Sequence, residues 1–136
     1  MVVTAGNIND TTMLSAVLDA VVVPRNGRPG RPRRRPDRVL ADKGYSSRAN
    51  RTLLRSRGIP HTIPEPKDQK ANRARRGSKG GRPVGFDWDL YRHRNTVERC
   101  FNRLKQWRGV AMRSDKHAHN YEGGLLLASV VLWGRT

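Results

Sequence analysis

The sequence predicts an α/β fold in which helices cover a sheet. Short runs of aliphatic and β-branched residues alternate with segments of helical periodicity along the first half of the chain. Two helical segments then follow one another, and the second of them is strongly apolar. The resulting order of strand, helix, strand, helix, strand, helix, helix is typical of a sheet flanked by helices.

The first strand and the first helix are expected at the start of the chain. Val2 and Val3 are interpreted as the end of a strand. Because a lone strand has no pairing partner, we expect the earlier strands of its sheet to be missing. Asn9 or Asp10 can cap a helix from about Thr11 to Ala20. Its apolar residues are Met13, Val17 and Ala20 on one face, with Leu14 and Leu18 beside them.

A basic loop separates this helix from the next strand. Prolines and glycines interrupt the segment Arg25–Asp37 and exclude both a helix and a central strand. The segment Arg38–Ala41 is then predicted as a short strand that ends at Asp42. The turn D-K-G-Y leads into a helix from about Ser46 to Arg57, which Gly58 terminates.

The second half of the chain is predicted to be mainly helical. Prolines punctuate the segment Ile59–Glu65, which is predicted as a short strand near an edge. Residues 66–86 are polar and glycine-rich without an apolar period, which predicts a mobile polar loop. Helices are expected from about Trp88 to Arg108 and from about Asn120 to Trp133, the last one buried. The whole chain of 136 residues is expected to form one domain.

The charge of the chain indicates a polyanionic partner. Lys and Arg number 28 against 11 Asp and Glu, for a net charge of +17. Nucleic acid is the first candidate. A membrane is not expected as a partner, because the chain has neither a basic amphipathic helix with a clear apolar face nor a lipidation signal. The only cysteine, Cys100, excludes an intramolecular disulfide and favours a reducing cytoplasm.

One predicted helix carries a polar stripe beside an apolar one. At about 100° per residue, four polar side chains project within roughly 60° of one another. These are Tyr91, Arg94, Glu98 and Lys105. The adjoining apolar stripe consists of Leu90, Val97, Phe101 and Leu104, and the opposite flank carries Arg92, Arg99 and Arg103. From spacing alone, Arg94 and Glu98 can equally be a structural ion pair on an ordinary amphipathic helix.

The polar stripe resembles a known motif. The pattern Y-x2-R-x3-E-x6-K is similar to the signature of insertion-sequence transposases that have an RNase H-like DDE core. The segment LADKGYSS resembles the D-x-G-Y motif that carries the second aspartate of that family. The segment GNINDTTMLSAVLD and the closing apolar helix extend the resemblance over essentially the whole chain. The resemblance implies the carboxyl-terminal portion of an RNase H-like mixed sheet flanked by helices, incomplete because the first strands are missing.

The resemblance also implies a function and a set of site residues. Asp42 and Glu98 would be catalytic carboxylates that bind Mg²⁺ or Mn²⁺ for two-metal cleavage and rejoining of DNA ends. Arg94 and Lys105 would hold the DNA backbone and orient Glu98, and Tyr91 would help to position the DNA end. The basic residues expected to bind DNA are Arg92, Arg99, Arg103, Arg31, Arg33 and Arg34. The expected partner is double-stranded DNA, both element ends and target, at the nucleoid of a bacterial cytoplasm; self-association is left open.

The first aspartate of a DDE core has no counterpart in the sequence. The first aspartate of a DDE core is expected on a strand, and none of the remaining candidates fits that position. These candidates are Asp10, Asp19, Asp37 and Asp68. We therefore expect a truncated transposase that is inactive alone. For Asp42 itself, the alternative is that D-K-G only makes a tight turn.

Two other functions remain open. The loops GRPGRPRRRP and KGGRPVG each contain a G-R-P core that resembles the minor-groove AT-hook, which suggests a DNA-binding module without catalysis. A decayed remnant without activity is the other alternative. Dependence on a metal ion separates the enzyme from the binding module.

Overall fold

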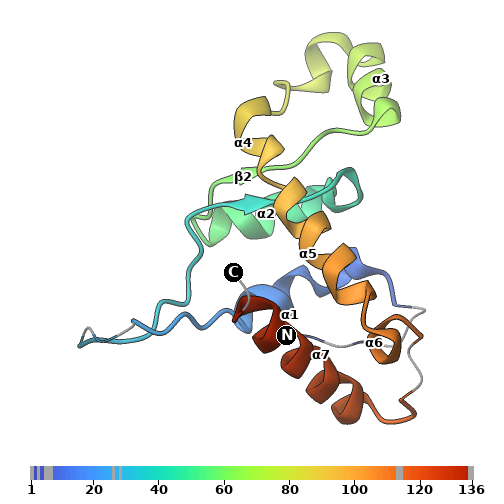
Figure 1. Ribbon diagram of the computed structural model, residues 1–136. Coiled ribbons are helices and arrows are strands. Elements are labelled where there is room, and N and C mark those ends of the chain that lie inside the picture. Colours follow the sequence, from blue (N-terminus) through green and yellow to red (C-terminus); the bar gives the residue numbers. More distant parts are fainter. Residues whose placement is uncertain are drawn as a thin grey trace. The chain divides into compact units, whose positions relative to one another are not determined.

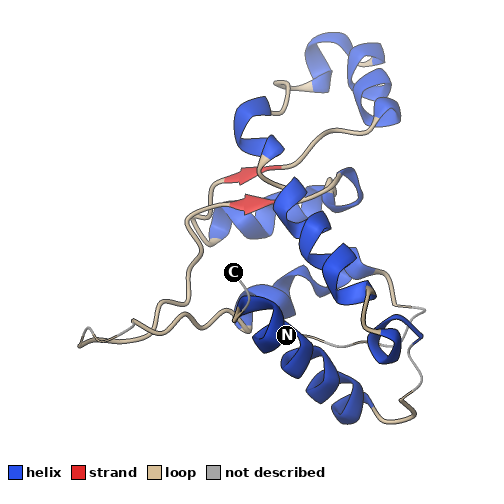
Figure 2. Ribbon diagram, viewed as in Figure 1, coloured by secondary structure: helices blue, strands red, loops and turns tan. Residues whose placement is uncertain are grey.

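The structure is a computed structural model that describes residues 2, 4, 8–25, 27, 29–112 and 115–134. The chain, which we expected to be one domain, divides into two compact units. One unit is Asn9–Arg92, and the other joins Met1–Ile8 to His93–Thr136. Figure 1 labels the elements along the chain, and Figure 2 distinguishes helices from strands.

The unit Asn9–Arg92 contains the two strands found among the described residues. Its elements are η1 (Asp10–Met13), α1 (Leu14–Asp19), β1 (Val39–Leu40), η2 (Lys43–Tyr45), α2 (Arg48–Ser56), β2 (His61–Thr62), α3 (Lys67–Arg75), η3 (Gly77–Gly80) and α4 (Trp88–Arg92). The other unit contains α5 (Asn95–Lys105), α6 (Arg108–Met112) and α7 (Ala118–Trp133). Of the strand predicted at the start of the chain, Val2 is not in a strand and Val3 lies outside the described residues.

A parallel β-α-β unit forms the centre of Asn9–Arg92. β1 pairs in parallel with β2, Val39 opposite His61 and Leu40 opposite Thr62, and α2 makes the connection between them (Figure 2). The strand signals at Arg38–Ala41 and Ile59–Glu65 are therefore confirmed in shortened form. A helix-rich chain with a small parallel sheet agrees with the predicted α/β class.

Both ends of α2 follow from local sequence. The Ser47 hydroxyl caps the first turn by accepting a hydrogen bond from the Asn50 amide at 3.1 Å. At the other end Gly58 adopts a φ of 61°, and the Gly58 and Ile59 amides donate to the carbonyls of Arg55 and Leu54. This is a Schellman arrangement, which confirms Gly58 as the residue that terminates the helix.

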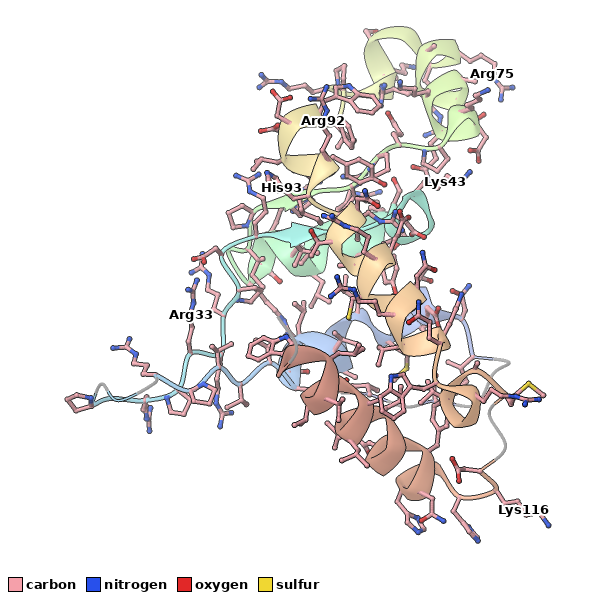
Figure 3. The ribbon with its side chains drawn as sticks, viewed as in Figure 1. Arg33, Lys43, Arg75, Arg92, His93 and Lys116 are labelled. Carbon is pink, nitrogen blue, oxygen red and sulfur yellow. The ribbon has the colours of Figure 1, made fainter. Side chains whose placement is uncertain are left out.

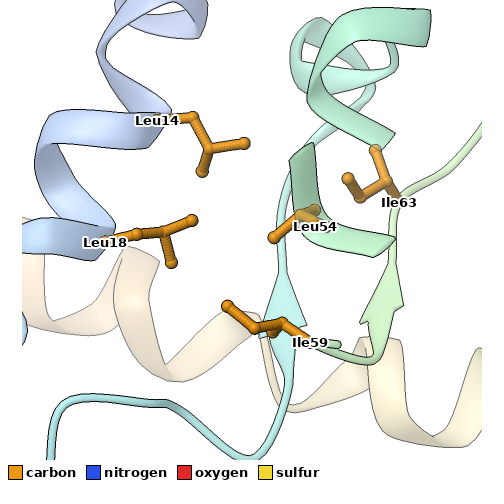
Figure 4. Close-up of a cluster of buried hydrophobic side chains, with 5 residues drawn as sticks. All are labelled: Leu14, Leu18, Leu54, Ile59 and Ile63. Atoms are coloured by element: carbon orange, nitrogen blue, oxygen red, sulfur yellow. The ribbon is translucent and has the colours of Figure 1, made fainter. Parts of the chain in front are cut away.

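Five aliphatic side chains form the core of this unit. Figure 4 shows Leu14 and Leu18 of α1 together with Leu54, Ile59 and Ile63 from the β-α-β unit. Leu54 and Ile63 are completely inaccessible to solvent. On the face of α1 that groups Met13, Val17 and Ala20, Val17 and Ala20 are exposed. The buried pair at i and i+4 belongs to Leu14 and Leu18, which face α2.

Residues 66–86 are not the continuous loop that the sequence predicted. α3 occupies Lys67–Arg75 and η3 follows it. The segment is polar, as expected, but its lysine, glutamine, alanine and arginine residues all favour the helical state. The prediction missed α3 because it looked for an apolar period, and α3 has no buried residue.

The helix predicted from Trp88 to Arg108 is also divided. α4 ends at Arg92 and α5 begins at Asn95, with the Thr96 and Val97 amides bonded to the carbonyls three residues earlier. The residues His93 to Val97 include several with low helix propensity, which accounts for a tightened turn at this point. A second interruption separates α5 from α6 at Gln106 and Trp107.

The unit with α5, α6 and α7 has a small buried core. The Tyr121 hydroxyl of α7 donates to the Val110 carbonyl of α6 at 3.2 Å. Leu104 of α5 and Ala128 of α7 are buried. The predicted last helix is confirmed, but its predicted burial is wrong. Four of its large apolar side chains are exposed, namely Leu126, Leu127, Val130 and Trp133. No helix in the described part of the chain is both long and apolar enough to cross a membrane.

We predict that Leu54→Ala destabilises the unit Asn9–Arg92 by about 2–5 kcal/mol, because the substitution leaves a cavity at a fully buried position. Leu53→Ala is the matched control, since Leu53 is only partly buried beside the same cluster. Urea unfolding followed by circular dichroism measures both variants. Equal losses of stability in the two variants would contradict the assignment of the core.

Candidate functional site

Asp42 lies just beyond the carboxyl end of β1. Its side chain is half-buried, and its Oδ1 accepts a hydrogen bond from the Gly44 amide at 2.9 Å. Asp42 is thereby the N-cap of η2. A side chain at position 44 would crowd the same oxygen, since a Cβ there would lie 3.0 Å from Oδ1. The tight-turn role that the sequence offered as an alternative is therefore real, and it holds the carboxylate at the strand end where α/β sheets bind ligands.

Asn50 holds the turn of Asp42 against η1. Its side-chain amide donates to the carbonyls of Tyr45 and Thr11, each at 3.3 Å. Burial raises the pKa of Tyr45, and the negative charges of Asp10 and Asp42 raise it further. Asp10 is therefore near this turn. The sequence offered Asn9 or Asp10 as a cap, and the side chain of Asn9 is the cap of η1.

A buried arginine supports the same turn from the other side. Arg51 is 6% exposed, and its Nη2 donates to the Ser46 hydroxyl at 2.8 Å and to the Ile63 carbonyl at 3.0 Å. Burial lowers the pKa of Arg51, and the negative charge of Glu65 opposes that effect. The sequence-based prediction missed Asn50 and Arg51. The signal that could have found them is their position on the inner face of α2, at the spacing of Leu54.

Glu98 lies in the first turn of α5, where a negative charge is favourable. Its Oε1 accepts a hydrogen bond from Arg94 Nη1 at 2.6 Å. The side chains of Arg94 and Glu98 are 29% and 55% exposed. The predicted contact of Arg94 with Glu98 is confirmed. Asp42 and Glu98 belong to different compact units, and their convergence stays a prediction from the sequence.

The rest of the predicted stripe is divided between the two units. Lys105 is the exposed last residue of α5, two helical turns from Glu98 on the same face. Tyr91 lies in α4, where its ring packs against Phe86 with centroids 5.0 Å apart. The interruption between α4 and α5 means that one continuous helix does not align Tyr91 with Glu98.

The predicted DNA-binding arginines are all exposed. Arg99 and Arg103 stand one turn apart on α5, and Arg92 of α4 is 3.7 Å from Asp89. In the basic loop, Arg33 pairs with Asp37, and its backbone forms an antiparallel bridge with Val23. Figure 3 labels Arg33 in this loop and Arg92 on α4. Arg31 and Arg34 lie close to Arg33 in the same loop.

The described residues contain no group of three or more side chains that could hold a metal ion. None of the other aspartates considered above lies in a strand. Asp10 opens η1, Asp68 is in the first turn of α3, and Asp37 pairs with Arg33. Asp19 ends α1 and accepts a hydrogen bond from Arg57 at 2.6 Å, which lowers its pKa. Asp42 and Glu98 supply the hard oxygen donors that Mg²⁺ and Mn²⁺ prefer, but not a complete set.

Comparison with known proteins agrees with the resemblance of the two motifs. Residues 1–133 match the family model described as "Transposase DDE domain". A putative transposase for insertion sequence element IS402 from Burkholderia cepacia is 31% identical over 135 residues, which cover 99% of this chain and 56% of that protein. A putative transposase for IS6501 from Brucella ovis is 38% identical over 50 residues, covering 37% of this chain and 38% of that protein.

No solved structure matches the chain. The chain spans little more than half the length of the Burkholderia relative, and the family model covers nearly all of the chain. With D-K-G-Y at the end of β1 and an Arg94–Glu98 pair at the start of α5, the chain belongs to the insertion-sequence transposases with a DDE domain.

Proposed function

We propose that this chain supplies the second aspartate and the glutamate of a DDE transposase that cleaves and rejoins DNA ends. Asp42 and Glu98 are the two metal ligands in this proposal. The observation that carries it is the position of Asp42 in a chain of this family. Its carboxylate lies at the carboxyl end of β1 and is held there because it caps η2 through the Gly44 amide. Family membership supports Glu98 as the partner carboxylate.

A divalent ion bound to these carboxylates would activate the attacking water or 3′-hydroxyl and stabilise the leaving oxygen. The residues of the chain provide the remaining functions. The Arg94 guanidinium donates a hydrogen bond to Glu98, which supports its role in orienting that carboxylate, and Arg94 is also the expected contact for the DNA backbone. Lys105 adds a second cation on the same face of α5. Tyr91 helps to position the DNA end.

We further propose that the DDE core is RNase H-like and that the chain is inactive alone. The parallel pair β1 and β2 with α2 between them supports the first statement, since it provides a β-α-β element of such a sheet. The setting of the other aspartates supports the second statement, because Asp10, Asp19, Asp37 and Asp68 all lie outside the described strands, where the first ligand of a DDE core is expected. Loss of one acidic ligand lowers both the affinity and the geometric control of Mg²⁺.

A basic DNA-binding module without catalysis is the alternative. The exposed Arg31 of the loop GRPGRPRRRP and Arg82 of KGGRPVG favour it, since AT-hook arginines must be accessible to enter a minor groove. Under this alternative, DNA binding depends on salt and does not depend on a metal ion.

We predict that Mn²⁺ binds weakly to the full chain and that Asp42→Asn and Glu98→Gln each lower its affinity several-fold. Each substitution removes a carboxylate charge from the ion. Titration followed by electron paramagnetic resonance of free Mn²⁺ measures the affinity. Asp68→Asn is the matched control, because Asp68 is an exposed aspartate outside the proposed site. Equal affinity in all four proteins would contradict the proposal and favour the binding module.

We predict that the chain self-associates through α7, whose apolar side chains are exposed. Sedimentation velocity at increasing concentration should show larger species for the parent chain. The double variant Leu127→Gln, Val130→Gln should remain smaller, because it makes this surface polar. Unchanged sedimentation of the variant would show that α7 is not the associating surface.

A further inference from the structure

α3 is a helix without an apolar face that could pack against the rest of the protein. The nine residues Lys67–Arg75 contain no apolar side chain larger than alanine, and none of them is buried. Isolated helices of this length are marginal in water, and most helical stability in proteins comes from packing an apolar face. Polar contacts must therefore hold α3 in place.

Two polar contacts attach α3 to its surroundings, one to the segment between β2 and α3 and one to the β-α-β unit. Arg73 pairs with Glu65, and their side chains are only 20% and 11% exposed. The Ser46 hydroxyl donates to Gln69 Oε1 at 3.1 Å and accepts from the buried Arg51 at 2.8 Å. Ser46 directly follows η2, the turn that Asp42 caps. The position of α3 is thereby fixed relative to Asp42 within one compact unit.

η3 folds back on α3. A side chain at Gly80 would collide with the Arg73 carbonyl oxygen, so the chain can return against α3 only through a glycine. Gly77 and Gly81, on either side of it, have φ values of 51° and 75°, which also favour glycine. α3 and η3 consequently form one compact polar element.

The outward surface of this element is strongly basic. Residues 67–79 contain six basic residues and one acidic residue, Asp68. Arg73 forms an ion pair with Glu65. The other five basic residues are exposed: Lys67, Lys70, Arg75, Arg76 and Lys79. Figure 3 shows Arg75 projecting from the outer side of α3. Five exposed cations within thirteen residues, on an element held by partly buried polar bonds, are suited to a repeating anion such as a nucleic acid backbone.

We propose that α3 and η3 bind the phosphate backbone of double-stranded DNA and hold it in register with Asp42. The proposal rests on the proposed function, because it assumes that DNA is the substrate near Asp42. It gives a role to a segment that the sequence predicted as a mobile loop. The hydrogen bond between Ser46 and Gln69 links α3, and with it the bound DNA backbone, to the turn that contains Asp42.

Binding of a double-stranded oligonucleotide to the full chain at several salt concentrations tests the charge. Lys70→Gln with Arg76→Gln should reduce the slope of log affinity against log salt by about 0.9 for each phosphate that is no longer neutralised. The matched control removes two exposed charges outside the element, Arg55→Gln with Lys116→Gln. The control should change the slope less. Equal slopes in the two double variants would overturn the proposal.

Cross-linking tests the location directly. In a Cys100→Ser background, a photoreactive azidophenacyl group on Lys70→Cys should cross-link to bound DNA, and the same group on Arg55→Cys should do so several-fold less. Circular dichroism confirms that each variant remains folded. Gln69→Leu should weaken the Lys70→Cys cross-link by releasing α3 from Ser46, whereas Gly85→Ala should not, because nothing lies near Gly85.

The outcomes separate this inference from the proposed function. A chain that binds DNA, with equal cross-linking from both cysteine positions, overturns the role of α3 and leaves the proposed function standing. A parent chain that does not bind DNA at any salt concentration overturns both.

Discussion

The hydrogen bonds of one buried guanidinium hold together the part of the chain that carries Asp42. Arg51 donates to Ser46 and to Ile63, so it joins the end of the D-K-G-Y turn to the residue that follows β2. A buried cation is costly, and here burial lowers its pKa while Glu65 favours the charged form. Arg51 Nη1 has no hydrogen-bond partner in the described part of the chain. The bonds of Nη2 therefore have to offset a substantial desolvation cost, which argues that the geometry they impose is needed.

That geometry serves both the carboxylate and the basic element. Through Ser46, Arg51 reaches Gln69 of α3, and Asn50, one residue before Arg51, reaches Tyr45 and Thr11. One turn of α2 thus fixes η1, the turn of Asp42 and α3 together. Glu98 has no comparable frame among the described residues, since it is exposed on the first turn of α5 and held by Arg94. The rigidity of the two proposed ligands is therefore unequal.

Local signals explain what the sequence could and could not predict. Gly58 at the end of α2, and the β-branched or aliphatic residues of β1, have local physical effects, so their prediction succeeded. α3 was missed because the prediction looked for an apolar period, whereas polar contacts with Glu65 and with the distant Ser46 hold this helix. The long helix from Trp88 was wrong because the apolar period masked low propensity near His93. The burial of α7 was wrong because apolarity alone does not supply a packing partner.

The proposed function assumes that Asp42 and Glu98 bind the same divalent ion. Fe²⁺ in place of Mg²⁺, with ascorbate and peroxide, generates hydroxyl radicals that cut the polypeptide beside the bound metal. We expect cuts near both residue 42 and residue 98, and the loss of both sets in Asp42→Asn. Cuts near residue 98 that persist in Asp42→Asn would contradict a shared ion, because the two carboxylates would then act on separate ions.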